Sequence, residues 1–291
     1  MERVAGAVVQ GPHDAQRQLR TVVTATGGSA LLLYDHPLSS YAQKVKIALR
    51  EKGLHFTTEL PESFGTGRSD GPFAAANPRT EVPVLIDGAV SIFESTVILE
   101  YIEERWPEPP LLPRDPAARA FARMTEDVCD TQYEAVNWGF GEVLWFGRAT
   151  GTLAEHLTAQ ARAQTRALQD WLTRRLGAAD WFGGAGFGWA DAAVAPMVNR
   201  SVHYGLGPEP GTSLAAWHAR LRRRPSVAAT FIEFDAAAAK MAAASDLYTT
   251  GGRRREYRDH PLEWMIKSGG VEVVLAGLRD GDIRFPWPQG D

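Results

Sequence analysis

The residues of this chain best suited to chemistry lie between Val82 and Ser95. Pro83 heads an apolar stretch and cannot donate a hydrogen bond to a sheet, so it starts a strand or follows a cis bond. Glu94 and Ser95 close the stretch and precede a helical pattern, so Ser95 can cap that helix while the first-turn amides point at whatever binds there. A free carboxylate and unpaired backbone donors beside a rigid proline predict a small-molecule pocket.

The elements that must position these residues follow a recognisable order. In chain order the pattern predicts a strand at 30–34, a helix from Ser39 or Ser40 to Gly53, a strand at 55–60, a helical turn near 72–76, strands on both sides of an Asp87-Gly88 hairpin, and a helix at 95–105. A strand–helix–strand unit followed by a hairpin and a helix is the order of a thioredoxin-like α/β domain.

A proline-rich linker at 106–116 separates this part from a helical part, because five prolines in that stretch exclude a helix. The helical period then predicts helices at 117–147, 152–178, 190–204, 213–223 and 226–244. The fold class is therefore α/β plus all-α: a thioredoxin-like domain at 30–105 and a helical bundle at 117–244. We expect a flexible arm at 1–29, and at 245–291 an extension that packs on the helical domain and holds short helices at 261–267 and 271–278.

The composition limits which kinds of partner the protein can be expected to bind. A net charge of −4 argues against a nucleic-acid binder, which would carry a basic stripe. Cys129 is the only cysteine, which excludes an intramolecular disulfide and a cysteine-based zinc site, and the seven histidines show no metal-ligand spacing. No apolar run has the length of a membrane span. We therefore expect a cytoplasmic protein that binds no metal.

Two stretches resemble the cytosolic glutathione S-transferases, specifically a serine-type, bacterial-like member with a C-terminal extension. They are Val82–Leu85 with Phe93–Ser95, and Ser39–Leu49 with Glu51–Gly53. The resemblance covers about residues 30–244 and is strongest over 31–112. It implies glutathione as co-substrate, a homodimer with the glutathione site near its interface, and an apolar electrophile held by the helical domain.

The catalytic task implied by the resemblance is to keep glutathione as its thiolate, since a free thiol has a pKa near 8.5. Ser39 matches the catalytic position of the serine-type families, whose cysteine-type relatives carry a cysteine there. A plain helix cap also explains a serine at this position. Ser40 takes the role if the register shifts by one residue, and Tyr34 is a further competitor because other branches use a tyrosine near the end of the first strand. An apolar strand also suits Tyr34 as a core residue.

The resemblance also implies the residues that hold glutathione. Glu94 and Ser95 would bind its γ-glutamyl end, and Val82 would offer its backbone groups to the cysteinyl part, with Pro83 fixing that edge. Many relatives carry Lys or Gln where this chain has Glu81, which would repel the glycyl carboxylate. The residues available to compensate are Arg79 and Lys52.

The helical domain carries weaker markers. Relatives usually have Ser or Thr at the position of Gly188, where Asp191 bonds back to the start of a buried helix, so Asp191 is expected to be structural. An aromatic group that lines either the electrophile pocket or the core comprises Trp138, Phe140, Trp145 and Phe146. The rival functions are a glutathione-dependent isomerase, a dehalogenase, an ether-cleaving lyase and a non-catalytic binding or scaffold module on the same fold.

Overall fold

The computed structural model describes residues 31–66, 70–184, 186–241, 262 and 269–280. Its N-terminal part holds the strands β1 (Leu31–Tyr34), β2 (Phe56–Glu59), β3 (Val84–Asp87) and β4 (Val90–Phe93), and the helices α1 (Ser40–Glu51), α2 (Gly71–Ala76) and α3 (Ser95–Arg105). The strands form one sheet in the order β2-β1-β3-β4, with β1 and β2 parallel and the other pairs antiparallel. The predicted thioredoxin-like arrangement is confirmed.

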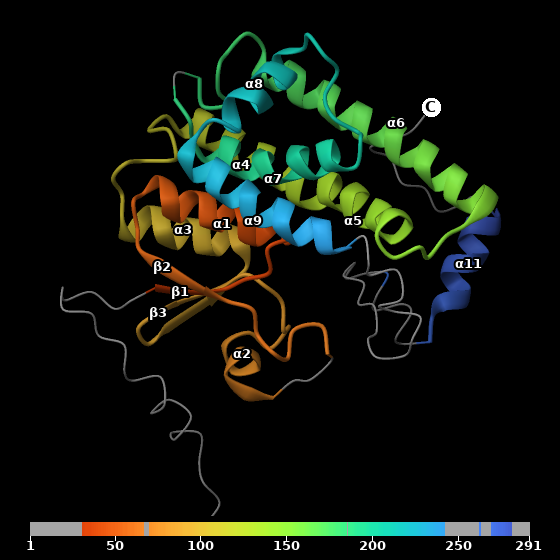
Figure 1. Cartoon of the computed structure of the whole chain (residues 1–291), viewed down its shortest axis with the longest axis horizontal. Coiled ribbons are helices and arrows are strands. Elements are labelled where there is room, and N and C mark those ends of the chain that lie inside the picture. Colours follow the sequence, from red (N-terminus) through yellow and green to blue (C-terminus); the bar gives the residue numbers. More distant parts are fainter. Residues whose placement is uncertain (1–30, 67–69, 185, 242–261, 263–268, 281–291) are drawn as a thin grey trace, which may run out of the picture.

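The sheet lies between helices on its two faces (Figure 1). Because β1 and β2 are parallel, the chain needs a long crossover between them, and α1 supplies it. The face beneath α1 and α3 is closed by an apolar cluster that includes Leu33, Val45 and Ile98. On the opposite face, Phe73 of α2 packs against a second cluster.

The helical part consists of α4 (Pro116–Val128), the π-helical turn η1 (Cys129–Tyr133), α5 (Glu134–Leu144), α6 (Gly151–Leu176), α7 (Trp189–His203), α8 (Ser213–Leu221), α9 (Pro225–Met241) and α11 (Val271–Asp280). Its core surrounds α7, of which residues 189–201 are all buried. Trp217 of α8 and Phe231 of α9 pack into this core. Figure 1 shows α7 surrounded by the other helices above the sheet.

The prediction of one helix at 117–147 is wrong in two respects. The five-residue turn η1 interrupts it, and the helix ends at Leu144 rather than at 147. Gly147 has a φ of 57°, a left-handed conformation that glycine adopts at low cost and that the interior of a right-handed helix cannot contain. Apart from Leu262, the predicted helix at 261–267 lies outside the described residues, as do most of the two terminal segments.

The start of α7 explains why glycine stands at position 188. The backbone N–H of Trp189 donates to the carbonyl of Leu111 at 2.8 Å, which brings the connector against the helix start. A Cβ on Gly188 would come within 2.8 Å of that same oxygen. Asp191 accepts hydrogen bonds from the N–H groups of Gly188 and Phe182, each at 3.0 Å. Through these contacts Asp191 holds the start of α7, which is the structural role expected from the sequence.

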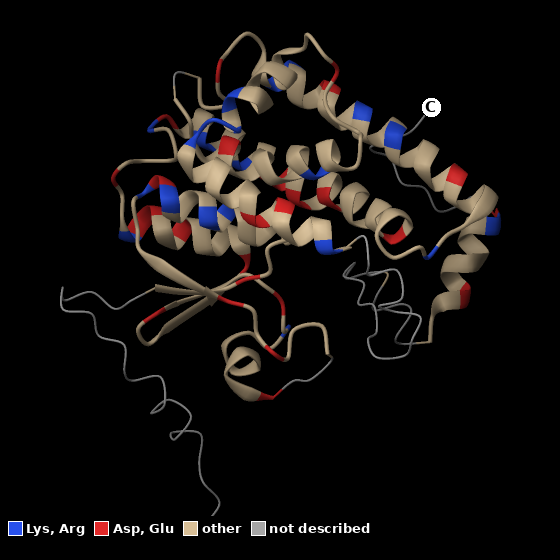
Figure 2. Cartoon of the chain, in the orientation of Figure 1, with Lys and Arg blue, Asp and Glu red and all other residues tan. Residues whose placement is uncertain are grey.

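The two domains meet along α1 through charged side chains. Figure 2 shows blue and red bands on α1 and on the helices above it. Lys46 pairs with Asp35 and Glu233, each at 2.7 Å, although its ammonium is fully buried. Glu51, at the end of α1, accepts two hydrogen bonds from Arg224, each at 2.6 Å. Helix α1 is therefore held on one side by the sheet and on the other by ion pairs to the helical domain.

Candidate active site

Ser39 lies immediately before α1 and caps it. Its hydroxyl oxygen accepts a hydrogen bond from the Ala42 N–H at 3.2 Å, and its carbonyl accepts one from Gln43 at 2.9 Å. Within the described residues, the N–H groups of Ser40 and Tyr41 make no hydrogen bond. A half-buried hydroxyl and two unpaired amides thus gather at the positive end of a helix dipole, an arrangement that favours an anion.

Ser40 points elsewhere. Its side chain is wholly buried beside Glu134 of α5, whose carboxylate pairs with Arg200 at 2.8 Å. Burial raises the pKa of Glu134, and Arg200 opposes that rise. Arg200 also donates to the carbonyl of Leu38, two residues before Ser40. Ser40 therefore belongs to the contact between the domains.

Tyr34 is a core residue. Its side chain is 5% exposed, and its ring meets the ring of Phe73 edge-on with centroids 5.3 Å apart. Burial raises the pKa of its phenol, and the nearby charge of Glu59 raises it further. These contacts are those of a core residue, which is one of the two roles that the sequence left open for Tyr34.

Val82 and Pro83 form the edge next to β3. The bond between them is cis, and β3 begins one residue later, at Val84. Neither the N–H nor the carbonyl of Val82 has a hydrogen-bond partner among the described residues. An unpaired donor and acceptor on one residue match what an extended peptide needs in order to add to a sheet edge.

Glu94 has an unusual backbone conformation, with φ 71° and ψ 115°. A non-glycine residue in such a sparsely populated region costs about 1–3 kcal/mol and is found most often at functional sites. Its carbonyl accepts the Ile98 N–H at 2.9 Å, which makes Glu94 rather than the predicted Ser95 the cap of α3. Ser95 is the first helical residue; it is buried, and its hydroxyl has no partner in the described part of the chain.

Arg79 lies with these residues. Its guanidinium pairs with the Glu94 carboxylate, and both side chains are partly exposed. The backbone N–H of Arg79 donates to the Asn77 side-chain oxygen at 3.0 Å, while the Asn77 amide group donates to the Glu81 carbonyl at 2.9 Å. Asn77 thus fixes the loop that carries both Arg79 and Glu81 beside the Val82 edge.

The structure does not bring Lys52 into this group. Its ammonium is fully buried, donates to the carbonyls of Trp106 and Pro109, and pairs with Glu103 at 2.7 Å. Lys52 therefore ties the end of α1 to the connector between the domains. A lysine with three partners inside the protein has no donor left for glutathione.

A buried cluster of charged side chains on the other side of α1 was not predicted from the sequence. The ammonium of Lys44 pairs with Asp130 and, at 2.5 Å, with Glu126. It also donates to the Thr96 hydroxyl at 3.3 Å, next to Ser95. Burial raises the pKa of Asp130 to about 6 against the opposing charge of Lys44. A lysine inside an amphipathic helix normally signals a solvated face, so no sequence pattern marked these residues.

A buried apolar cluster adjoins the start of α1. Leu38 packs against Phe234 and Ala238 of α9, with Trp145 beside them. The Trp145 ring also meets that of Tyr204, with centroids 5.1 Å apart. Of the predicted aromatic group, Phe140 and Phe146 are buried, whereas Trp138 and Trp145 are half-buried. Trp145 is the member that the structure brings next to the residue preceding Ser39.

Comparison with known proteins agrees with this geometry. Residues 33–110 match the family described as "Glutathione S-transferase, N-terminal domain", and residues 154–220 match its C-terminal counterpart. Glutathione S-transferase U28 of Arabidopsis thaliana is 32% identical over 212 residues, which cover 70% of this chain and 90% of the relative. The chain belongs to the glutathione S-transferase family. It is a transferase-like enzyme, and its relatives support glutathione-dependent transferase activity in general.

Solved structures of the family show the same likeness at the level of the fold. A glutathione S-transferase from Rhodospirillum rubrum F11 is 28% identical with a TM-score of 0.61, covering 69% of this chain and 91% of that one. Rice GST1, solved in complex with glutathione, is 27% identical with a TM-score of 0.60, covering 75% and 99%. Among the residues that the structure describes, no cluster of His, Cys, Asp and Glu could hold a metal ion, and no helix is long and apolar enough to cross a membrane.

Proposed function

We propose that this transferase is of the serine type and that Ser39 stabilises the glutathione thiolate. The observation that carries the proposal is the start of α1, where a hydroxyl and the unpaired amides of Ser40 and Tyr41 gather. Hydrogen bonds and a helix dipole directed at the sulfur favour the thiolate over the thiol, and each unit by which the thiol pKa falls corresponds to about 1.4 kcal/mol. The thiolate then attacks the electrophile as a nucleophile.

The remaining site residues would hold the peptide. Val82 supplies its unpaired N–H and carbonyl to the cysteinyl backbone, with Pro83 shaping that edge. Glu94 binds the γ-glutamyl ammonium, while the Ser95 hydroxyl and the first amides of α3 bind the γ-glutamyl carboxylate. Arg79 orients Glu94 through their ion pair and offsets the charge of Glu81.

The electrophile would be apolar and would lie against the exposed part of the Trp145 ring, whose neighbours Leu38 and Phe234 are buried. This surface lies next to Leu38, the residue before Ser39, where the thiolate would form. A glutathione-dependent isomerase, dehalogenase or ether-cleaving lyase would use the same thiolate and differ only in the compound placed on this surface. Screening electrophiles of each class distinguishes these reactions.

We also propose a homodimer in the cytoplasm. Val97 of α3 and Met124 of α4 are 52% and 43% exposed, and the two helices are joined by an ion pair between Arg123 and Glu100 at 2.6 Å. Each of these two helices thus leaves a large apolar side chain exposed, which a contact between two chains would bury. Analytical ultracentrifugation of the wild type and of Val97→Glu measures the dimer directly: the wild type should sediment as a dimer, and the variant as a monomer.

Calorimetric titration of glutathione, with S-hexyl glutathione as a second ligand, tests the peptide site. We expect saturable binding by the wild type and a loss of about 2 kcal/mol or more in Glu94→Ala, since removing one partner of a hydrogen-bonded charge pair costs that much. Glu104→Ala is the matched control, because Glu104 is exposed near the far end of α3. Equal affinities in Glu94→Ala and the control would contradict the assignment.

The second candidate is a non-catalytic binding module. The observation in its favour is that Arg79 already occupies the Glu94 carboxylate while Glu81 adds negative charge nearby. If neither ligand binds at millimolar concentration, the binding module replaces the transferase as the better description.

A further inference from the structure

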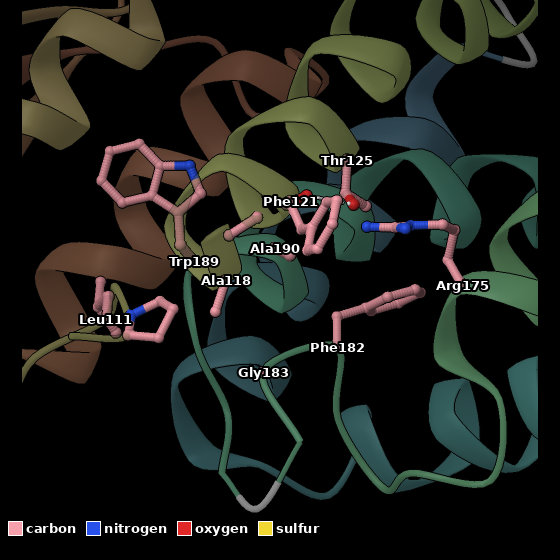
Figure 3. Close-up of a pocket in the computed structure, with 11 residues that line it drawn as sticks. Leu111, Ala118, Phe121, Thr125, Arg175, Phe182, Gly183, Trp189 and Ala190 are labelled. Atoms are coloured by element: carbon pink, nitrogen blue, oxygen red, sulfur yellow. Dashed lines mark hydrogen bonds between the residues drawn. The ribbon is translucent and has the colours of Figure 1, made fainter. Parts of the chain in front are cut away.

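A hollow lies apart from the residues proposed to bind glutathione. It has a volume of about 250 Å³ and is formed by the connector at Leu111, the helix α4, the end of α6 and the start of α7 (Figure 3). None of the residues assigned above to glutathione lines it. Its walls therefore serve no part of the proposed transfer reaction.

One positive charge dominates the hollow. Arg175 is the only charged residue in the lining, and Figure 3 shows its side chain reaching from α6 toward the middle. Within the described part of the chain it forms neither an ion pair nor a hydrogen bond, and its Nε is buried without a partner. The guanidinium lies over the rings of Phe121 and Trp171, with distances of 4.9 and 5.9 Å to their centroids. Ring contacts stabilise a cation but leave its hydrogen-bond donors unused.

The start of α7 adds to the positive potential. Ala190 lines the hollow as the second residue of this 15-residue helix. The N–H of Trp189 is taken by Leu111, whereas that of Ala190 makes no hydrogen bond within the described residues. The helix dipole favours negative charge at this end. The dipole and Arg175 therefore attract the same kind of group.

The walls favour a flat apolar body. Figure 3 shows the rings of Phe121 and Phe182 close to the Arg175 guanidinium, while Trp189 lines the hollow farther away, with its indole turned away from Arg175. Trp189 is 1% exposed and its indole N–H donates to Glu126, so it adds no polar group to the hollow. An inorganic anion would gain nothing from such walls, whereas an aromatic ring stacks on them.

We propose that this hollow binds a small aromatic carboxylate. The carboxylate would pair with the guanidinium of Arg175, whose planar fork matches a carboxylate with two parallel hydrogen bonds. The aromatic body of one or two fused rings would lie against Phe121 and Phe182. This site is independent of the glutathione site, so two ligands of different chemistry would bind to one chain.

Calorimetric titration of 2-naphthoate into the full-length protein tests the proposal. We expect saturable binding of one molecule per chain, unchanged by saturating glutathione, and weaker by at least about tenfold in Arg175→Met. Arg174→Met is the matched control, because it removes the same charge from an exposed neighbour on α6. The neutral analogue 2-naphthalenemethanol should bind at least about tenfold more weakly than the acid.

Arg175→Lys and a thermal unfolding curve of each variant separate binding from folding. Lysine keeps the charge and loses the planar fork, so its affinity should lie between those of the wild type and Arg175→Met. The proposal is overturned if Arg175→Met folds and binds 2-naphthoate as tightly as the wild type. It is equally overturned if glutathione displaces the acid, if the neutral analogue binds as well, or if no binding occurs at millimolar concentration.

Discussion

Lys44 of α1 and Glu126 of α4 form an ion pair buried between the two domains, with side chains 0% and 2% exposed. Glu126 also accepts a hydrogen bond from the indole of Trp189, and Lys44 pairs with Asp130 as well. Charges removed from water this completely depend on one another, because each compensates the desolvation of its partner. The pair therefore makes the docking of the domains sensitive to a single side chain.

Removing the charge of Lys44 tests this dependence. We expect Lys44→Met to lower the free energy of unfolding by about 3 kcal/mol, since Glu126 and Asp130 would be left without their cation. Lys240→Met, on the exposed side of α9, should change it by less than about 0.5 kcal/mol. Urea unfolding monitored by circular dichroism measures both. Equal stability of the two variants would show that the buried cluster contributes nothing.

Substitution of Ser39 separates a helix cap from a catalytic hydroxyl. Ser39→Ala should lose about 1 kcal/mol of stability with the cap, whereas Ser39→Asn should keep the stability, because asparagine caps equally well. Both variants lack the hydroxyl, so in both the pKa of bound glutathione should rise by about 1 unit or more, or about 1.4 kcal/mol. Ultraviolet absorbance of the thiolate, followed against pH, reports this pKa. A thiol pKa in Ser39→Asn as low as that in the wild type would assign Ser39 to capping alone.

Glu81 is expected to weaken the binding of glutathione, which carries a net negative charge. Its loop borders Val82, and a partly exposed charge at such a distance contributes about 1 kcal/mol or less. Glu81→Gln should therefore tighten binding by about two- to fivefold at low salt, and added salt should shrink the gain. Titration calorimetry at two salt concentrations measures this, with Glu104→Gln as the control. A gain unaffected by salt would point to a cause other than charge.

His218 should make the protein less stable in mild acid. Burial lowers the pKa of its imidazole to about 4, with the charge of Arg222 adding to the effect. Between the ordinary pKa of 6.5 and this lowered value, the unfolded chain takes up a proton that the folded chain does not, so stability falls as pH falls. The wild type should lose about 3 kcal/mol more over this range than His218→Gln.

Chemical denaturation across the same pH range measures that difference. The control is His156→Gln, because His156 is exposed on α6 and should follow the wild type. Asp130 and Asp191 titrate near pH 6 with the opposite sign, but they are common to all three proteins and cancel in the comparison. Parallel pH profiles for the wild type and His218→Gln would contradict the assignment.

The only thiol should be inert in the folded protein. Cys129 is fully buried, and burial raises the pKa of its thiol well above the ordinary value, with the nearby charge of Asp130 raising it further. Because the thiolate is the reactive form, an aromatic disulfide reagent should label the native protein negligibly and the unfolded protein with one equivalent. Rapid stoichiometric labelling of the native protein would show that the turn η1 opens readily.

Local pattern predicted the thioredoxin-like half of the fold closely. Strand and helix positions there follow from apolar periodicity and from residues that end a helix or strand, namely Gly53, Pro83 and the Asp87-Gly88 turn. Both signals depend only on residues close together in the sequence. The interruption at η1 could not be predicted in this way. A π-helical turn depends on how α4 packs against α7, which is a tertiary constraint.

The same contrast between local pattern and tertiary contact applies to the residues of the candidate site. Ser39, Val82 and Glu94 stand out in the sequence because a helix start or a strand end marks each of them. Lys52 was misplaced because its partners, Trp106 and Pro109, lie more than fifty residues away along the chain. Sequence spacing shows what an element can present on its surface, but it does not show which distant segment satisfies a charge.

Helix α1 carries Ser39 at its start and, along its length, the side chains that join the two halves of the molecule. A chimera that exchanged the first domain for that of a relative would exchange these partners as well, and would leave Glu126 and Glu233 facing foreign residues. Chimeras of such transferases should therefore not be joined at the proline-rich linker, because that junction separates α1 from the residues it pairs with. The helical domain and α1 need to come from the same parent protein.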